Sequence, residues 1–124
     1  MAKILIVDDS AFARNNLRSI LEHGQHEIVG LAEDGKQALS LFKSMNPELV
    51  MLDYLMKGKN GMEVLREMLQ LDAAAKIIII SGIGDAIIEE KVLEAGARKF
   101  VEKPYAQSNI LKIIDQVMGS ESVV

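Results

Sequence analysis

The stretch LVMLDYLMKGKNG, residues 49–61, joins an apolar run to a single carboxylate and then to a glycine-containing loop. Residues 49–52 are apolar at every position, which is typical of a strand covered on both faces in a parallel sheet. Asp53 ends that run, and Gly58 and Gly61 follow it. The stretch therefore predicts an inner strand that carries one acid to its C-terminal end. On its own, Asp53 is as compatible with a turn as with a reactive group.

Four other short segments have the apolar, β-branched composition of strands, and helical periodicity separates them. The five predicted strands are residues 4–7, 27–32, 48–53, 76–81 and 99–103. The first two predicted helices are residues 11–23 and 35–45. The apolar positions that mark the five helices are Phe12, Leu17, Ile20 and Leu21; Ala38, Leu39, Leu41, Phe42 and Met45; Met62, Leu65, Met68 and Leu69; Ile88, Val92 and Ala95; and Ile110, Ile113, Ile114 and Val117. This alternation predicts an α/β domain with a five-stranded parallel sheet, right-handed crossovers and five flanking helices.

The composition excludes several classes of protein. The 124 residues contain no cysteine, which rules out disulfides, cysteine zinc sites and a cysteine nucleophile and fits a reducing compartment. The net charge of -4 and the pI near 5.2 argue against a general nucleic-acid binder. The longest apolar runs, such as residues 77–80, are far shorter than the ~20 residues of a membrane helix, and the start MAKILIVDDS lacks the features of a signal peptide. We expect a cytoplasmic protein that binds neither nucleic acid nor membrane.

Polar side chains stand at the C-terminal ends of four predicted strands. They are Asp8 and Asp9, Asp53, Ser81 and Lys103. Because parallel strands end at the same edge of a sheet, we expect these groups to meet where such sheets bind ligands. Neighbouring carboxylates raise one another's pKa unless a cation compensates, and oxygen donors without histidine or cysteine suit magnesium or calcium. With a lysine and a hydroxyl beside them, the pattern favours phosphoryl chemistry with an aspartate nucleophile.

Each of these groups also has a plainer explanation when it is considered alone. Residues 8–10 form a good helix N-cap cluster, residues 81–82 carry little information, and residues 103–104 are a common strand-to-helix junction. The presence of chemically compatible groups at four separate strand ends favours a functional site over coincidence.

Four segments resemble the receiver domains of two-component response regulators, of the stand-alone CheY-like type. They are ILIVDDS, LVMLDYLMKGKNG, IIIISG and GARKFVEKPY, and the resemblance covers essentially the whole chain. It implies the flavodoxin-like strand order 2-1-3-4-5. It also implies a receiver domain over residues 1–120, and we expect residues 121–124 to form a frayed tail.

The resemblance implies a role for each acid. Asp53 matches the acceptor of a phosphoryl group from the phosphohistidine of a histidine kinase. Asp8 and Asp9 match the acidic pair that binds Mg²⁺ together with the acceptor, with Asp9 coordinating it directly. Leu55 would offer its main-chain carbonyl to the same ion.

The resemblance also implies a switch. Ser81 matches the hydroxyl that moves toward the phosphoryl group, Lys103 the lysine that contacts it, and Phe100 the aromatic side chain that turns inward on activation. Phosphorylation would then reshape the face made by the fourth helix, fifth strand and fifth helix, which binds a downstream target, with a chemotaxis-type output among the options. We expect a monomer that catalyses only its own phosphotransfer and dephosphorylation, with dimerisation on activation as an alternative.

The chain departs from the family pattern in its loops. Lys57 stands where the family usually has proline, residues 60–61 are Asn-Gly where Asp-Gly is usual, Gly82 stands where alanine is frequent, and Phe100 lacks the hydroxyl of the common tyrosine. None of these changes removes a reactive group. They concern the stiffness of two loops and the balance of the switch.

Two further predictions come from apolar side chains. Leu55 and Ile83 lie two positions beyond the acceptor and the switch residue, and neither can hold an attacking water by a side-chain hydrogen bond. We therefore predict slow self-dephosphorylation. Ile87 lies off the apolar stripe of the fourth helix, so it is either an exposed contact on the output face or packed under the neighbouring loop.

Rival functions fit the residues less well. A magnesium-dependent phosphatase of the haloacid dehalogenase class expects a second aspartate at the position of Leu55, and a flavodoxin-like binding module expects a Ser/Thr/Gly-rich loop in place of DDSAF. A pseudo-receiver would lack the acids and lysine. An isolated receiver from a larger regulator or hybrid kinase, and a phosphate sink, stay open. His23 and His26 are interpreted as a solvated turn, and Arg14 and Arg18 as a solvated helix face.

Overall fold

The computed structural model describes residues 1–119, so the tail predicted at 121–124 lies outside the described residues. The strands are β1 (Lys3–Val7), β2 (Glu27–Ala32), β3 (Leu49–Asp53), β4 (Ile77–Ser81) and β5 (Lys99–Glu102). The helices are α1 (Ala11–His23), α2 (Gly35–Met45), α3 (Gly61–Leu71), α4 (Ala86–Ala95) and α5 (Gln107–Gly119). All strand pairs are parallel, in the order β2-β1-β3-β4-β5. The predicted α/β fold and strand order are confirmed.

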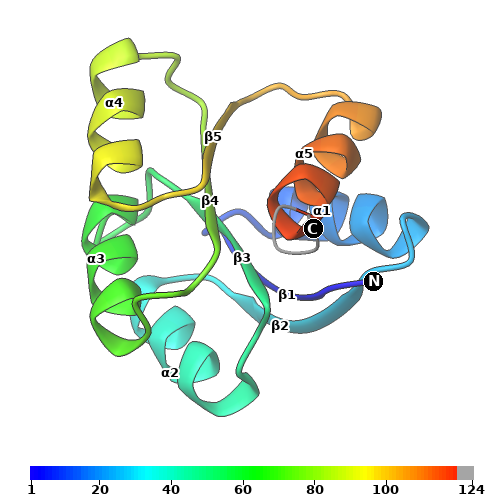
Figure 1. Ribbon diagram of the computed structural model, residues 1–124, viewed down its shortest axis with the longest axis horizontal. Helices are drawn as coiled ribbons and strands as arrows, with labels where there is room; N and C mark the ends of the chain where they lie inside the picture. The colour runs from blue at the N-terminus through cyan, green and yellow to red at the C-terminus, as the bar shows by residue number, and fades with distance from the viewer. Residues whose placement is uncertain (120–124) are drawn as a thin grey trace.

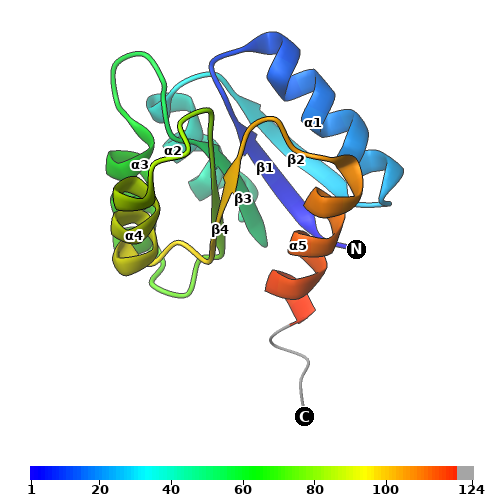
Figure 2. The same ribbon diagram turned by 90° about the horizontal axis from the view of Figure 1, so that it is seen from above.

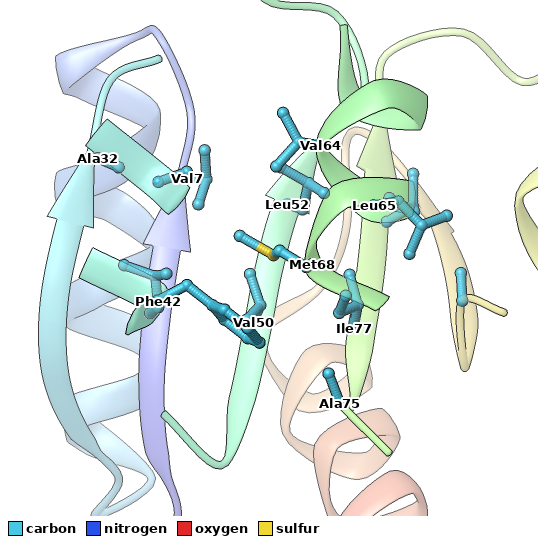
Figure 3. Packing of buried hydrophobic residues seen from close by; sticks show 14 of the residues in the cluster. Val7, Ala32, Phe42, Val50, Leu52, Val64, Leu65, Met68, Ala75 and Ile77 are labelled. Carbon is cyan, nitrogen blue, oxygen red and sulfur yellow. The ribbon is translucent and has the colours of Figure 1, made fainter. Parts of the chain in front are cut away.

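Helices cover both faces of the sheet, with α2, α3 and α4 on one side and α1 and α5 on the other (Figure 1). Successive residues of β3 therefore enter different cores, because side chains alternate across a strand. Val50 and Leu52 pack in the cluster that contains Met68 of α3 (Figure 3), whereas Leu49 and Met51 belong to the cluster of the opposite face. This two-sided burial explains why the run before Asp53 is apolar at every position.

The predicted apolar stripes are confirmed except at two helix ends. Phe12 was expected on the buried stripe of α1, but its side chain is 82% exposed. Leu17 is five residues further along the helix, which places Phe12 roughly 140° around the axis from it. Met45, the last residue of α2, is also exposed, because the helix ends there with Asn46 in the left-handed conformation.

Four helices, α1 to α4, start directly after the loops at the C-terminal edge of the sheet with a side-chain N-cap. The N-caps are Ser10, Asp34, Asn60 and Asp85, and each accepts a hydrogen bond from a backbone N–H of the first turn. Figure 2 shows the connections that follow β1, β3, β4 and β5 gathered at this one edge. The fold therefore brings together the strand ends on which the predicted site depends.

The helices within residues 1–119 are at most 13 residues long. Not one of them combines the length and the apolar character that crossing a bilayer requires.

Candidate functional site

Three acids lie together at the C-terminal edge of the sheet. Asp8 and Asp53 are buried, Asp9 is exposed, and one carboxylate oxygen from each lies within 4.8 Å of the others. Asp8 and Asp9 follow β1, and Asp53 ends the adjacent strand β3. We call these three residues the acidic cluster. A donor set of carboxylate oxygens without histidine or cysteine fits a hard divalent cation such as Mg²⁺.

Lys103 reaches the acidic cluster from the end of β5. Its Nζ lies 2.9 Å from Oδ2 of Asp8 and 3.5 Å from Oδ1 of Asp53. Burial alone would lower the pKa of Lys103, but the hydrogen bond to Asp8 and the charges of both acids outweigh burial and raise it. The backbone N–H of Lys103 also donates to the carbonyl of Ser81, which ties the end of β5 to the end of β4. Lys103 therefore places a positive charge beside the acidic cluster.

The carboxyl of Asp53 is a weaker acid than usual, because its surroundings raise its pKa. Burial raises the pKa of its carboxyl to about 6, the negative charge of Asp8 adds to the effect, and Lys103 opposes it. Burial disfavours the ionised form because less water surrounds the charge. A cation bound by the acidic cluster would favour the carboxylate, which is the form that a nucleophile needs.

Asp8 is held at every polar atom. Its N–H donates to the carbonyl of Ala32, its Oδ1 accepts from the N–H of Ser10 at 2.9 Å, and its Oδ2 accepts from Lys103. Its carbonyl accepts from Nη1 of Arg14 at 2.6 Å. The prediction that Arg14 lies on a solvated helix face is wrong, because the side chain folds back from α1 and is half-buried. Helical periodicity does not reveal such a contact, since it places the residue on a face but not the guanidinium.

The loop after Asp53 approaches the acidic cluster closely. The N–H of Gly61 donates to the carbonyl of Tyr54 at 2.7 Å, and a Cβ at position 61 would lie 2.7 Å from the Cα of Tyr54. Gly61 is therefore required by the close passage of two backbones. The Leu55 carbonyl accepts no hydrogen bond within residues 1–119, and Lys57 is exposed and makes no ion pair with the described residues.

The remaining predicted site residues lie on β4 and β5. Ser81 is fully buried, and its Oγ accepts a hydrogen bond from the N–H of Ile83 at 3.0 Å. Phe100 is half-buried and packs against the core beneath α3 and α4. Ile83 is 40% exposed and Ile87 is 63% exposed, which confirms the exposed alternative for Ile87.

The two histidines lie away from the acidic cluster, as expected: His23 is the last residue of α1, and His26 directly precedes β2. His23 is exposed, but the solvated interpretation is wrong for His26. Its Nδ1 accepts a hydrogen bond from the N–H of Ala2, and burial, with a contribution from the N-terminal charge, lowers its pKa.

Comparison with known proteins agrees with this geometry. Residues 4–115 match the family described as response regulator receiver domain. The chain belongs to this family. Family membership disfavours the phosphatase and flavodoxin-like rivals, and it confirms the resemblance drawn from the four sequence segments.

Relatives match this receiver over nearly its whole length. Protein CcdB of Bacillus subtilis (strain 168) is 39% identical over 119 residues, covering 96% of this chain and 99% of the relative. Chemotaxis protein CheY of Halobacterium salinarum is 40% identical over 119 residues, covering 95% and 98%. A chain in the crystal structure of the CheX-CheY-BeF3-Mg²⁺ complex from Borrelia burgdorferi superposes with a TM-score of 0.90 at 30% identity, covering 94% of this chain and 88% of that one.

Proposed function

We propose that this receiver accepts a phosphoryl group from the phosphohistidine of a histidine kinase onto Asp53, in a reaction that requires Mg²⁺. The main support for this proposal is the acidic cluster, with Nζ of Lys103 within 3.5 Å of a carboxylate oxygen of Asp8 and of Asp53. The likeness to a CheY structure that contains BeF3 and Mg²⁺ supports the same chemistry.

In this proposal, an oxygen of Asp53 attacks the phosphorus, the P–N bond to the imidazole breaks, and an acyl phosphate forms. The electron pair returns to the imidazole nitrogen, so no further reactant is needed. Lys103 holds its ammonium beside the oxygen of Asp53 and balances the anionic phosphoryl oxygens. Asp8, Asp9 and the Leu55 carbonyl would hold Mg²⁺ together with Asp53. When bound, the ion offsets the charge of the carboxylates and of the transferring group.

We assign the switch to Ser81. Its Oγ accepts from the N–H of Ile83 in this structure. Its own O–H is therefore available to donate to a phosphoryl oxygen. A move of this hydroxyl toward Asp53 would pull on the loop before α4 and change the packing of Phe100, biasing an equilibrium of the α4–β5–α5 face.

Treatment with acetyl phosphate, which donates a phosphoryl group, or with beryllofluoride, which mimics a bound phosphoryl group, tests this function when Mg²⁺ is present. Wild type should gain one phosphoryl group by intact mass after acetyl phosphate treatment, and chelation of the metal should prevent it. Asp53→Asn should gain none, whereas Asp115→Asn, a change at an exposed acid of α5, should react like wild type. Equal labelling of Asp53→Asn and wild type would overturn the assignment.

The partners follow from the same proposal. A histidine kinase supplies the phosphoryl group, and a target protein binds the α4–β5–α5 face. A chemotaxis-type output is one option, and the alternatives are a phosphate sink or a receiver that forms part of a larger regulator. Cytoplasmic location and a monomeric state stay predictions, with dimerisation on activation as the alternative. Exposed Ile87 is the candidate contact, so Ile87→Ala should weaken capture of the target by the beryllofluoride-treated protein and leave phosphorylation unchanged. Unchanged capture would remove Ile87 from the interface.

A further inference from the structure

Arg14 makes a contact with the metal-binding segment that the proposed function does not use. It lies near the start of α1, and its Nη1 donates to the main-chain carbonyl of Asp8 at 2.6 Å. Arg14 is partly buried, whereas Arg18 one turn later is exposed and pairs with Glu22 at 3.4 Å. The two arginines of this helix therefore have different surroundings.

The electrostatics of the helix do not explain the position of Arg14. The first turn of a helix carries partial positive charge, so a cation there is unfavourable, and fixing a long side chain also costs rotamer entropy. The compensating interaction is the hydrogen bond to Asp8, in which a charged donor binds a partly buried carbonyl. The contact thus accounts for an arginine at a place where helix formation alone disfavours it.

The accepted carbonyl belongs to the peptide unit that joins Asp8 to Asp9. Its orientation determines where the chain turns out of β1 and where the side chain of Asp9 starts. The carboxylate of Asp8 is held by Ser10 and Lys103, but the carboxylate of Asp9 is exposed and makes no hydrogen bond with the described residues. Only the backbone around it keeps Asp9 close to the other two acids.

We propose that Arg14 is a positioning residue for divalent-cation binding, an inference that rests on the proposed function. By holding the peptide between Asp8 and Asp9, it keeps the Asp9 carboxylate within reach of Asp8 and Asp53. It touches neither the cation nor the phosphoryl group and acts through the main chain alone. Its loss should therefore weaken cation binding much more than it slows the reaction at saturating cation.

Titration with Mg²⁺ by calorimetry, without any phosphodonor, tests this inference. Arg14→Met removes the donor and should weaken Mg²⁺ binding about tenfold, as loss of a residue that orients a ligand typically does. Arg14→Lys keeps one donor and should recover part of the affinity. Arg18→Met, the matched change on the same helix, should stay within about twofold of wild type, because exposed ion pairs contribute little.

A second measurement separates positioning from a general loss of structure. Phosphorylation by acetyl phosphate should show a raised Mg²⁺ requirement in Arg14→Met but nearly the wild-type rate at saturating Mg²⁺. Wild-type affinity in Arg14→Met, or an equal loss in Arg18→Met, overturns the inference and leaves the proposed function standing. If Arg14→Met does not fold, the Mg²⁺ affinities of Arg14→Gln and Arg14→Lys test the inference instead. Arg14→Lys, which keeps a charged donor, should bind Mg²⁺ more tightly than Arg14→Gln, and equal affinities would overturn the inference. A wild-type chain that binds no Mg²⁺ overturns both.

Discussion

The acidic cluster and the two loops beside it are held in different ways. Asp8 and Asp53 stand at the ends of buried strands, and Lys103 joins them from the end of β5. The loops at residues 54–60 and 82–85 instead leave apolar side chains in solvent, with Leu55 half exposed and Ile83 nearly as exposed.

This difference separates two kinds of control over the chemistry. The sheet fixes the groups that react, because strand pairing sets where β1, β3 and β5 end. The loops are positioned by a few local contacts, such as the hydrogen bond from Gly61 to Tyr54 and that from Ile83 to Ser81. Substitutions at the strand ends should therefore decide whether the reaction occurs, and substitutions in the loops should change rates.

The largest expected effect is at Gly61, the first residue of α3, which passes close to the end of β3. In Gly61→Ala, the new Cβ would lie 2.7 Å from the Cα of Tyr54 and 2.8 Å from the carbonyl oxygen of Asp53. We expect this overpacking to lower the free energy of unfolding by about 2 to 3 kcal/mol in urea titrations. Gly58→Ala is the control, because its φ of +81° costs about 1 kcal/mol but no atom lies within 4 Å. Equal losses of unfolding free energy in Gly61→Ala and Gly58→Ala would show that the close approach of Gly61 to Tyr54 does not limit the residue at position 61.

Ionised Asp53 should destabilise the folded chain when no cation is bound, because its carboxylate is buried beside Asp8. Its pKa in the folded chain, about 6, is higher than its ordinary 3.8, so the folded state holds the proton more strongly and stability falls as pH rises through this interval. Asparagine cannot ionise. With a chelator present, Asp53→Asn should therefore be more stable than wild type at pH 7 by about 1 to 2 kcal/mol, allowing for screening at this open edge.

Thermal or urea unfolding at several pH values measures this difference. It should shrink toward zero below about pH 4, where the carboxyl is protonated in both states. Added Mg²⁺ should also reduce it by stabilising wild type alone. A variant that is less stable than wild type at pH 7 would contradict the proposed cost of the buried charge.

The third prediction concerns the loops as regulators of rate. Because Leu55 and Ile83 are apolar and exposed, we expect slow loss of the phosphoryl group from Asp53. Ile83→Gln introduces a group that can hold a water near the phosphoryl group and should speed decay about fivefold, or about 1 kcal/mol in the barrier. Decay is followed after removal of the phosphodonor, with Ile83→Leu as the apolar control. Identical decay in Ile83→Gln and Ile83→Leu would contradict this role of the loop.

The smallest expected effect is at the ion pair that ties residues 54–60 to α3. Nζ of Lys59 lies 2.8 and 3.0 Å from the two carboxylate oxygens of Glu67, and the two side chains are 34% and 40% exposed. A double-mutant cycle with Lys59→Met and Glu67→Gln should give a coupling of about 0.5 kcal/mol. Hydrogen exchange of the loop should accelerate in each single variant. The charge-reversed pair, Lys59→Glu with Glu67→Lys, is the control and should restore slow exchange of the loop. A cycle without measurable coupling would show that this ion pair does not restrain the loop.

Local sequence signals predicted most of the fold. The apolar run before Asp53 correctly predicted an inner strand that ends at Asp53, although the strand begins at Leu49 and not at residue 48, because burial on two faces leaves a direct mark on residue type. Phe12 was misplaced because periodicity is weakest at a helix end. Arg14 and His26 were misjudged because each makes a hydrogen bond to backbone outside its own segment, and no local pattern records such a bond.

The chain by itself determined the five strand–helix units and the polar groups at their ends, since periodicity and strand-end chemistry are properties of neighbouring residues. Only the tertiary structure decided which of these groups meet. Lys103 lies 95 positions from Asp8, and their contact exists because strand order places β1 and β5 on either side of β3 and β4, with all ends at one edge. The pKa of Asp53 is likewise a tertiary property, because burial and the charges of Asp8 and Lys103 act through space.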